Sequence, residues 1–211
     1  MILEGKFITL EGIDGSGKST QLKMLADALR RQGIEAVTTR EPGGTPLGRR
    51  LREAFLETHE AVSPIAELLL FAADRAQHVE HLIKPSLAEG KIVISDRYAD
   101  ATAAYQGAGR GFPLDTIAEV IRLATAGLSP DMTLFFDIPV ESAVQRMQVR
   151  PDSEAKANRM DAETAEFYDR VRRAYLDIAA RESDRFVVID ASHTVEEVHR
   201  KVMLAVGRLI S

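Results

Sequence analysis

The sequence predicts an α/β fold, a doubly wound five-stranded parallel sheet with helices on both faces. Five short apolar runs rich in β-branched residues recur along the 211 residues, and segments of helical periodicity separate them. Continuous apolar strands that alternate with helices are typical of a parallel sheet covered on both faces. The chain is 45% hydrophobic and contains no linker, internal repeat or low-complexity tract. We therefore expect one domain with a substantial core.

The predicted strands are short runs that glycine-containing or polar segments bound. In chain order they read KFITL, EAVTT, KIVIS, MTLFF and FVVI, at residues 6–10, 35–39, 91–95, 132–136 and 186–189. Strands of this composition indicate burial on both faces of the sheet.

The predicted helices have apolar residues three and four positions apart, on one face. The first follows the first strand and contains Leu22, Leu25 and Leu29, and Gly33 ends it. Another helix follows residue 161 and repeats apolar residues through residue 178. Further helices are expected near residues 47–55, 66–87, 140–149 and 196–210.

One polar segment, RPDSEAKANRMD at residues 150–161, lies between two predicted helices and is too polar for a core. An exposed loop and a mobile lid both fit this composition. The phosphate chemistry described next favours a small lid at about residues 150–160.

The composition excludes several classes of site and partner. The chain has no cysteine, which rules out disulfides and zinc–thiolate sites. Its net charge of −5 argues against a general nucleic-acid binder. No apolar stretch is long enough for a membrane helix. We expect a cytoplasmic protein that binds neither nucleic acid nor membrane.

A phosphate-binding loop follows the first strand. Residues 12–19 read GIDGSGKS and fit the pattern GxxxxGK[ST] without deviation. The glycines let successive N–H groups point at one phosphate, and the next helix adds its positive N-terminal end. Lys18 reaches the β and γ oxygens of a nucleotide, and the Ser19 hydroxyl can ligate Mg²⁺. The position after a strand and before a helix is the one this mechanism requires.

A second element of the same chemistry is the strand IVIS, which ends at Asp96. In phosphate-loop proteins an acid at a strand end helps to hold Mg²⁺, whereas a helix-capping role is the alternative for an isolated aspartate. Together with the loop, the metal-linked role is favoured.

The remaining motifs favour a kinase over a switch. The guanine-reading NKxD motif is absent, and the pattern DxxG occurs only inside the phosphate loop. Arginines instead occur in several separate loops, as phosphoryl transfer between two nucleotides requires to offset the repulsion of many oxygens. Another nucleoside or nucleotide kinase and a non-enzymatic nucleotide switch remain the alternatives. The arginines are Arg52, Arg75, Arg97, Arg110, Arg146, Arg150 and Arg159.

Four motifs together resemble the bacterial thymidylate kinase family over nearly the whole chain. The phosphate loop is common to many families, but the second pair of motifs is specific. The motifs are FITLEGIDGSGKST, TREPGGTPLG, LLLFAADRAQH and SDRYADATAAYQGAGRG, at residues 7–20, 39–48, 68–78 and 95–111. The resemblance implies transfer of the γ-phosphoryl group of ATP to dTMP, which gives dTDP for dTTP synthesis.

The resemblance also implies the acceptor site. Arg97 and Arg52 would hold the dTMP phosphate, Phe71 would stack on thymine and Arg75 would bond a ring carbonyl. Thr102 and Gln106 would recognise the edge of the base, and Tyr105 would crowd the sugar 2′ position. Asp14 would contact the 3′-hydroxyl. Because one methyl group separates substrates by only about 10- to 200-fold, we expect dUMP to be a poor but real substrate. The implied acceptor residues are Asp14, Glu41, Pro42, Arg52, Phe71, Arg75, Arg97, Thr102, Tyr105 and Gln106.

On the donor side, the resemblance places ATP on the loop, with Arg146 against adenine and Ser192 and His193 near the same base. Mg²⁺ would be held by Ser19 and Asp96. The implied ATP residues are Gly12, Ile13, Asp14, Gly15, Ser16, Gly17, Lys18, Ser19, Thr20, Arg146, Ser192 and His193.

The family divides by whether the loop or the lid supplies its catalytic arginine. Residues 13–16 include no basic side chain, so the lid is expected to supply it. Arg150 is the first choice and Arg159 the second, and Lys156 is the other basic residue of this segment. Lys18, Arg97 and Asp14 complete the expected catalytic set. The family also implies a homodimer formed through helices. Residues 68–73 are apolar enough to take part in it, and a position facing the core is the alternative for them.

Overall fold

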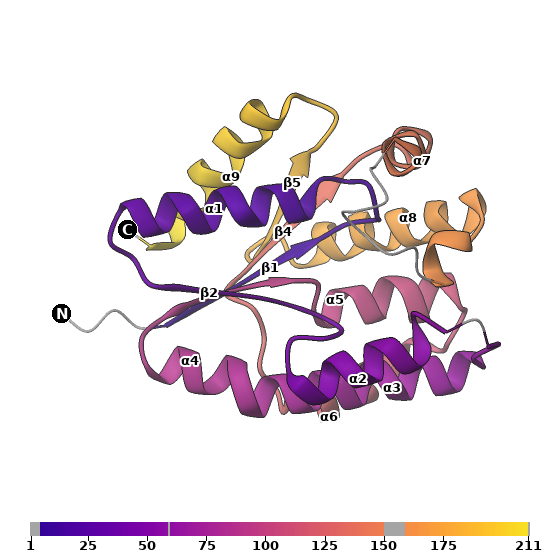
Figure 1. The fold of residues 1–211 in the computed structure, drawn as a ribbon. Coiled ribbons are helices and arrows are strands. Elements are labelled where there is room, and N and C mark those ends of the chain that lie inside the picture. Colours follow the sequence, from indigo (N-terminus) through magenta and orange to yellow (C-terminus); the bar gives the residue numbers. More distant parts are fainter. Residues whose placement is uncertain (1–4, 59, 150–158, 211) are drawn as a thin grey trace.

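The computed structural model describes residues 5–58, 60–149 and 159–210. Its five strands form one parallel sheet in the order β2-β3-β1-β4-β5 (Figure 1). The predicted fold class is confirmed, and each strand lies within one residue of its predicted bounds. The strands are β1 (Lys6–Glu11), β2 (Ala36–Arg40), β3 (Ile92–Asp96), β4 (Met132–Asp137) and β5 (Phe186–Asp190).

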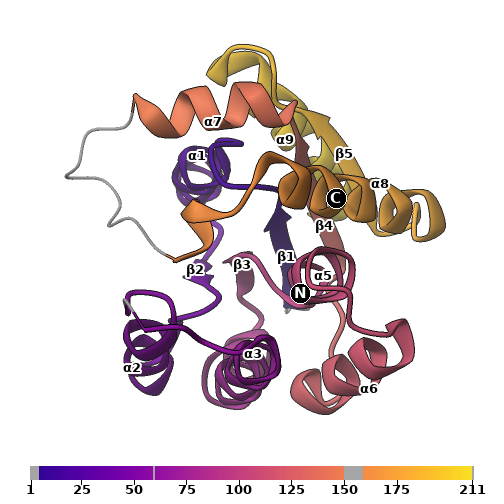
Figure 2. The ribbon, with the colours of Figure 1, turned by 90° about the vertical axis from the view of Figure 1, so that its right-hand side faces the viewer.

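The helices cover both faces of the sheet, as Figures 1 and 2 show. On one face α1 and α9 pack together. On the other lie α3, α4 and α6, with α8 against β4 and β5. The helices are α1 (Lys18–Arg31), α2 (Pro46–Phe55), α3 (Pro64–His78), α4 (Lys84–Ala88), α5 (Ala99–Thr102), α6 (Leu114–Thr125), α7 (Val140–Gln148), α8 (Ala165–Arg181) and α9 (Val195–Ile210).

The central strands send alternate side chains into two separate clusters. Phe7 of β1 pairs with Val93 of β3, and both contribute to the smaller cluster beneath the sheet. Ile8 and its partner Ile94 point the other way, into the main core. All four side chains are fully buried. This two-sided burial explains why β1 and β3 are apolar throughout.

The predicted helix at residues 66–87 is confirmed as a continuous helical stretch. A wider π-helical turn at Val79–Ile83 joins α3 to α4. Pro85 lies two residues after the end of this turn and cannot donate a backbone hydrogen bond. The wide turn accommodates this proline without ending the helix.

Residues 99–109 and 114–125 are helical, which the sequence analysis did not predict. A π-helical segment at Ala103–Gly109 lies between α5 and α6. Its glycines indicate a turn when they are considered alone, but packing explains Gly109. A Cβ atom there would lie 2.7 Å from the Phe167 ring of α8. The glycine therefore allows α8 to approach this segment.

Most of the segment expected to form the lid, residues 150–158, lies outside the described residues. Arg150 and Lys156 belong to this part. The last part of the segment, Arg159–Ala162, is described as a short 3₁₀ helix. In the part of the chain that is described, no helix is both long and apolar enough to cross a membrane.

Candidate active site

The phosphate loop joins the end of β1 to α1, and three of its glycines have backbone angles that other residues rarely adopt. The φ angles of Gly12, Gly15 and Gly17 are 140°, 82° and 93°. A Cβ atom on Gly15 would also lie 2.4 Å from the carbonyl oxygen of Ala143. The first turn of α1 carries no acidic residue. Its N-terminal end is thus free to favour an anion.

Lys18 lies within this loop and is nearly buried. Its Nζ donates to the carbonyl oxygens of Gly12 and Ile13 at 2.9 and 3.0 Å. Burial, with the nearby charge of Arg97, lowers the pKa of Lys18 to about 8. The Ser16 hydroxyl is buried and has no hydrogen-bond partner in the described part of the chain. These polar groups fit an anionic ligand at the loop.

Ser19 and Asp96 meet across the first turn of α1. Leu10 of β1 pairs with Asp96 of β3, so both strands end at the same edge of the sheet. Ser19 Oγ donates to Asp96 Oδ2 at 3.1 Å. A hydroxyl and a carboxylate next to a phosphate loop are oxygen ligands of the kind that Mg²⁺ prefers.

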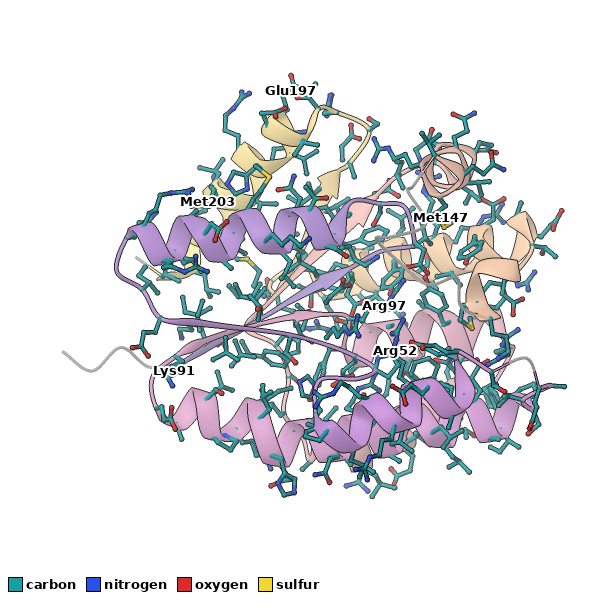
Figure 3. The ribbon with its side chains drawn as sticks, in the orientation of Figure 1. Arg52, Lys91, Arg97, Met147, Glu197 and Met203 are labelled. Carbon is teal, nitrogen blue, oxygen red and sulfur yellow. The ribbon has the colours of Figure 1, made fainter. Side chains whose placement is uncertain are left out.

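Arg97 lies where the phosphate loop meets a second site. Its φ angle is 73°, and its backbone N–H donates to the carbonyl of Leu10. The guanidinium donates to Gly12 O at 2.9 Å and to Asp14 Oδ1 at 3.0 Å. It also lies over the Tyr105 ring, 4.8 Å from the ring centre. Figure 3 shows Arg97 and Arg52 between the sheet and α2.

A pocket of about 550 Å³ opens beside Arg97. All the residues that the sequence analysis assigned to the acceptor line this one pocket. Leu56, Ala101 and Met160 line it as well and were not expected. The apolar periodicity that predicts buried positions does not distinguish a pocket wall from a core. The expected residues that line it are Asp14, Glu41, Pro42, Arg52, Phe71, Arg75, Arg97, Thr102, Tyr105 and Gln106.

Arg75 forms the deep end of this pocket and is only 1% exposed. Its Nε donates to Glu41 Oε2 at 2.8 Å, and one terminal nitrogen donates to Tyr98 O at 2.9 Å. The other terminal nitrogen donates to Thr102 Oγ1 at 2.8 Å. The Thr102 hydroxyl is therefore bound to Arg75 in this structure, rather than standing alone at the pocket wall.

Two further side chains, Phe71 and Gln106, line the same pocket. Phe71 packs edge-on against Phe55, with ring centres 4.9 Å apart. A T-shaped pair of this kind fixes the orientation of the Phe71 ring at the pocket wall. Gln106 is buried, and its Nε2 donates to Glu67 Oε1 at 2.9 Å.

Arg159 is the expected lid arginine that the structure describes. Its side chain donates to the carbonyl of Phe55 at 3.3 Å and to the Glu67 carboxylate. Its backbone N–H donates to Leu56 O at 2.9 Å. It is thus bound next to Leu56, which lines the pocket, but Arg159 itself does not line the pocket.

A second pocket, of about 800 Å³, lies on the other side of the phosphate loop. Arg146 and His193 line it as expected, and Arg146 donates to Ala191 O at 3.0 Å. Ser192 does not line it, because its N–H and its hydroxyl both bind Asp190. The unexpected lining residues are Gln21, Ala191, Thr194, Val195 and Val198.

Glu11, the last residue of β1, is a buried acid that the sequence analysis did not single out. Its carboxylate accepts from the Tyr98 N–H and from the Tyr175 hydroxyl, each at 2.7 Å. Burial, with the nearby Asp100, raises the pKa of Glu11 to about 8. An acid at the end of an apolar strand was the only signal in the sequence. Glu11 holds the backbone directly after Arg97, because it accepts from the Tyr98 N–H.

Comparisons with known proteins agree with this geometry. The family model described as thymidylate kinase matches residues 10–202. A thymidylate kinase from Desulfosudis oleivorans is 48% identical over 96% of this chain and 97% of that protein. One from Halothermothrix orenii is 45% identical over 95% of each chain. The crystal structure of thymidylate kinase from Ehrlichia chaffeensis superposes with a TM-score of 0.78, is 36% identical, and covers 96% of this chain and 98% of that one. The chain belongs to the thymidylate kinase family and is an ATP-dependent phosphotransferase that acts on dTMP.

Proposed function

We propose that the pocket beside Arg97 binds dTMP and that the phosphate loop with the second pocket binds ATP. The observation that carries this assignment is the position of Arg97. Its guanidinium lines the first pocket and also binds Gly12 and Asp14 of the phosphate loop. A cation at this junction lies between a donor and an acceptor phosphate, as in-line phosphoryl transfer requires.

In this assignment an oxygen of the dTMP phosphate attacks the γ-phosphorus of ATP, the bond from that phosphorus to the bridging oxygen breaks, and ADP leaves. The attacking oxygen is already ionised at neutral pH, so positioning and charge suffice. Lys18 and the loop N–H groups hold the donor phosphates. Arg97 and Arg52 hold the acceptor phosphate. Asp14, which Arg97 binds at 3.0 Å, faces the sugar 3′-hydroxyl.

Ser19 and Asp96 are proposed to hold Mg²⁺. Their oxygens lie 3.1 Å apart at the start of α1, and hard oxygen ligands suit this ion. The ion would offset negative charge on the donor phosphates.

Base recognition is proposed to depend on stacking and hydrogen bonds in the part of the pocket that Arg75 lines. Phe71 stacks on thymine, Arg75 donates to a ring carbonyl and Gln106 reads the ring edge. Thr102 contributes by holding Arg75, to which its hydroxyl is bound. Tyr105 lies beneath Arg97 and limits space at the sugar.

The chain is proposed to act as a single kinase domain with a lid at about residues 150–160 that supplies the catalytic arginine. Lys18 is the only basic side chain of the phosphate loop, which supports a cation from elsewhere. Arg150 is preferred because Arg159 is bound by Glu67 and Phe55.

We further propose a cytoplasmic homodimer. The substrates ATP and dTMP are cytoplasmic metabolites, and α3 offers an apolar surface. Ile65 and Leu69 lie one helical turn apart on α3 and are 51% and 56% exposed. Leu68, expected in the same surface, is instead fully buried in the core.

A coupled assay of ADP release tests the assignment. We expect rapid turnover with dTMP, slow turnover with dUMP and negligible turnover with free nucleosides. Equal rates with dTMP and dUMP would contradict the proposed base pocket. Turnover of a free nucleoside that matched dTMP would contradict the phosphate-binding role of Arg97.

A further inference from the structure

Glu67 is a buried carboxylate that lies directly behind the dTMP pocket. It is on the first turn of α3, is 0% exposed and does not line the pocket. Its Oε1 accepts from Gln106 Nε2 at 2.9 Å and from Arg110 Nε at 3.2 Å. Its Oε2 accepts from Arg110 at 3.1 Å and from Arg159.

These contacts keep Glu67 ionised. Burial opposes its charge, but hydrogen bonds from Arg110, Gln106 and Arg159 hold the pKa of Glu67 below its usual value. An ionised carboxylate accepts hydrogen bonds and cannot donate one. Two guanidiniums also compensate the buried charge, which would otherwise be expensive.

The charge of Glu67 decides which way the Gln106 amide faces. A glutamine amide has a donor end and an acceptor end, and a half-turn exchanges them. Only Nε2 can face Glu67, because two acceptors would repel each other. Oε1 is then the end left for the pocket that Gln106 lines. Within the described residues no group donates to Oε1, so it is available to a ligand.

We propose that Glu67 is a positioning residue that excludes cytosine by fixing the Gln106 amide. This inference rests on the proposed role of Gln106 in reading the base. Thymine carries a hydrogen on ring N3, which can donate to a fixed Oε1. Cytosine has only a lone pair there, and an unrestrained glutamine would turn over and donate to it. Glu67 prevents that half-turn, so dCMP meets two opposed acceptors.

The test compares kcat/KM for dTMP and dCMP in Glu67→Gln and in a matched control. The new amide can donate to Gln106 and so releases the half-turn. We expect the ratio of dCMP to dTMP to rise about tenfold or more, because an unpaired buried polar contact is what a hydrogen-bonding site uses to reject an analogue. The control is Glu163→Gln. Glu163 also binds Arg110, at 2.6 Å, and no contact with Gln106 is found among the described residues. Its ratio should stay unchanged.

A double-mutant cycle with Gln106→Met separates the two layers of the argument. Gln106→Met alone should raise the ratio, and adding Glu67→Gln should then change it no further. If Gln106→Met leaves the ratio unchanged, the reading role of Gln106 is wrong. If Gln106→Met raises the ratio and Glu67→Gln does not, the positioning role of Glu67 is wrong.

Unpaired buried cations in Glu67→Gln can impair folding. The double variant Glu67→Gln with Arg110→Gln removes the charge and one of its partners together, and it should raise the ratio as the single variant does. An unchanged ratio in this folded double variant would overturn the inference.

Discussion

At the active site, burial shifts the pKa of a charged side chain as much as neighbouring charges do. Lys18 shows this, because burial and Arg97 lower its pKa to about 8 while two backbone carbonyls hold its ammonium. A bound triphosphate adds negative charge next to the Lys18 ammonium, beyond that of Asp14 and Asp96. We therefore expect nucleotide binding to raise the pKa of Lys18 and to restore its full charge at neutral pH.

Glu11→Gln should change how stability depends on pH. The pKa of Glu11 is raised from 4.5 to about 8, so the folded state holds a proton that the unfolded state has lost between these values. The contribution of Glu11 to stability therefore falls as pH rises through this range. The free energy of unfolding of the unchanged protein, minus that of Glu11→Gln, should be larger at pH 5 than at pH 8. Urea unfolding at both pH values measures the difference, and a difference that does not vary with pH would contradict the expectation.

Arg150→Ala tests the lid arginine. Loss of such a group lowers rate by about 10³–10⁵ in related phosphoryl transfers. We expect kcat to fall strongly with little change in KM for dTMP, because Arg97 and Arg52 are proposed to hold the acceptor phosphate. Arg159→Ala serves as the comparison and should have the smaller effect on kcat. The opposite order would make Arg159 the catalytic residue.

Secondary-structure elements place the donor site through close approaches that only glycine permits. Gly15 has a φ angle of 82°. A Cβ atom on it would also lie 2.4 Å from the carbonyl oxygen of Ala143, which belongs to α7. Any side chain would push α7 away from the phosphate loop.

Gly15→Ala should therefore raise KM for ATP by about tenfold or more, which corresponds to about 1.4 kcal/mol, because its Cβ would collide with the carbonyl oxygen of Ala143 and displace the loop. Gly33→Ala is the matched control. Gly33 has a similar φ of 74°, but its Cβ would meet nothing within 4 Å. It should lower the melting temperature by a few degrees, about what 1 kcal/mol costs a chain of this size, and leave KM for ATP unchanged. A similar rise in KM in both variants would show that strain, not the Ala143 contact, is responsible.

The secondary-structure elements that could be predicted are those that the local sequence determines. The strands are visible because each is apolar across its whole length, as parallel strands buried on both faces must be. The helical segment around Gly109 was missed because this glycine serves a contact with Phe167, which is far away in the sequence. Ser192 was placed in the donor pocket, but its bond to Asp190 turns it away. Local hydrogen bonds of this kind cannot be predicted from residue type.

The acceptor pocket was predicted more completely, because its residues belong to motifs that the family resemblance could carry. The supporting carboxylates Glu11 and Glu67 were not predicted. They lie behind the residues that face the ligand, and nothing in their spacing distinguishes a buried acid from an exposed one on a helix or strand end.

The assembly of the whole molecule can be tested on the outer surface of α3. Leu69→Glu should convert a dimer into monomers in sedimentation velocity, because it places a charge in an apolar contact. Leu204→Glu is the control, since Leu204 is 62% exposed on α9, on the other face of the sheet. It should leave the dimer intact. A monomeric unchanged protein, or a dimer that survives Leu69→Glu, would contradict the proposed interface.

The link from Arg97 to Gly12 and Asp14 has a consequence for altering this enzyme. Arg97, which is proposed to hold the phosphate of dTMP, is bound to the loop that is proposed to hold the phosphates of ATP. Engineering a new acceptor preference at Arg97 would therefore disturb the grip on the donor. Substitutions in the part of the pocket that is proposed to bind the base leave the phosphate loop unchanged. They are the safer route to an enzyme that accepts new nucleotide analogues.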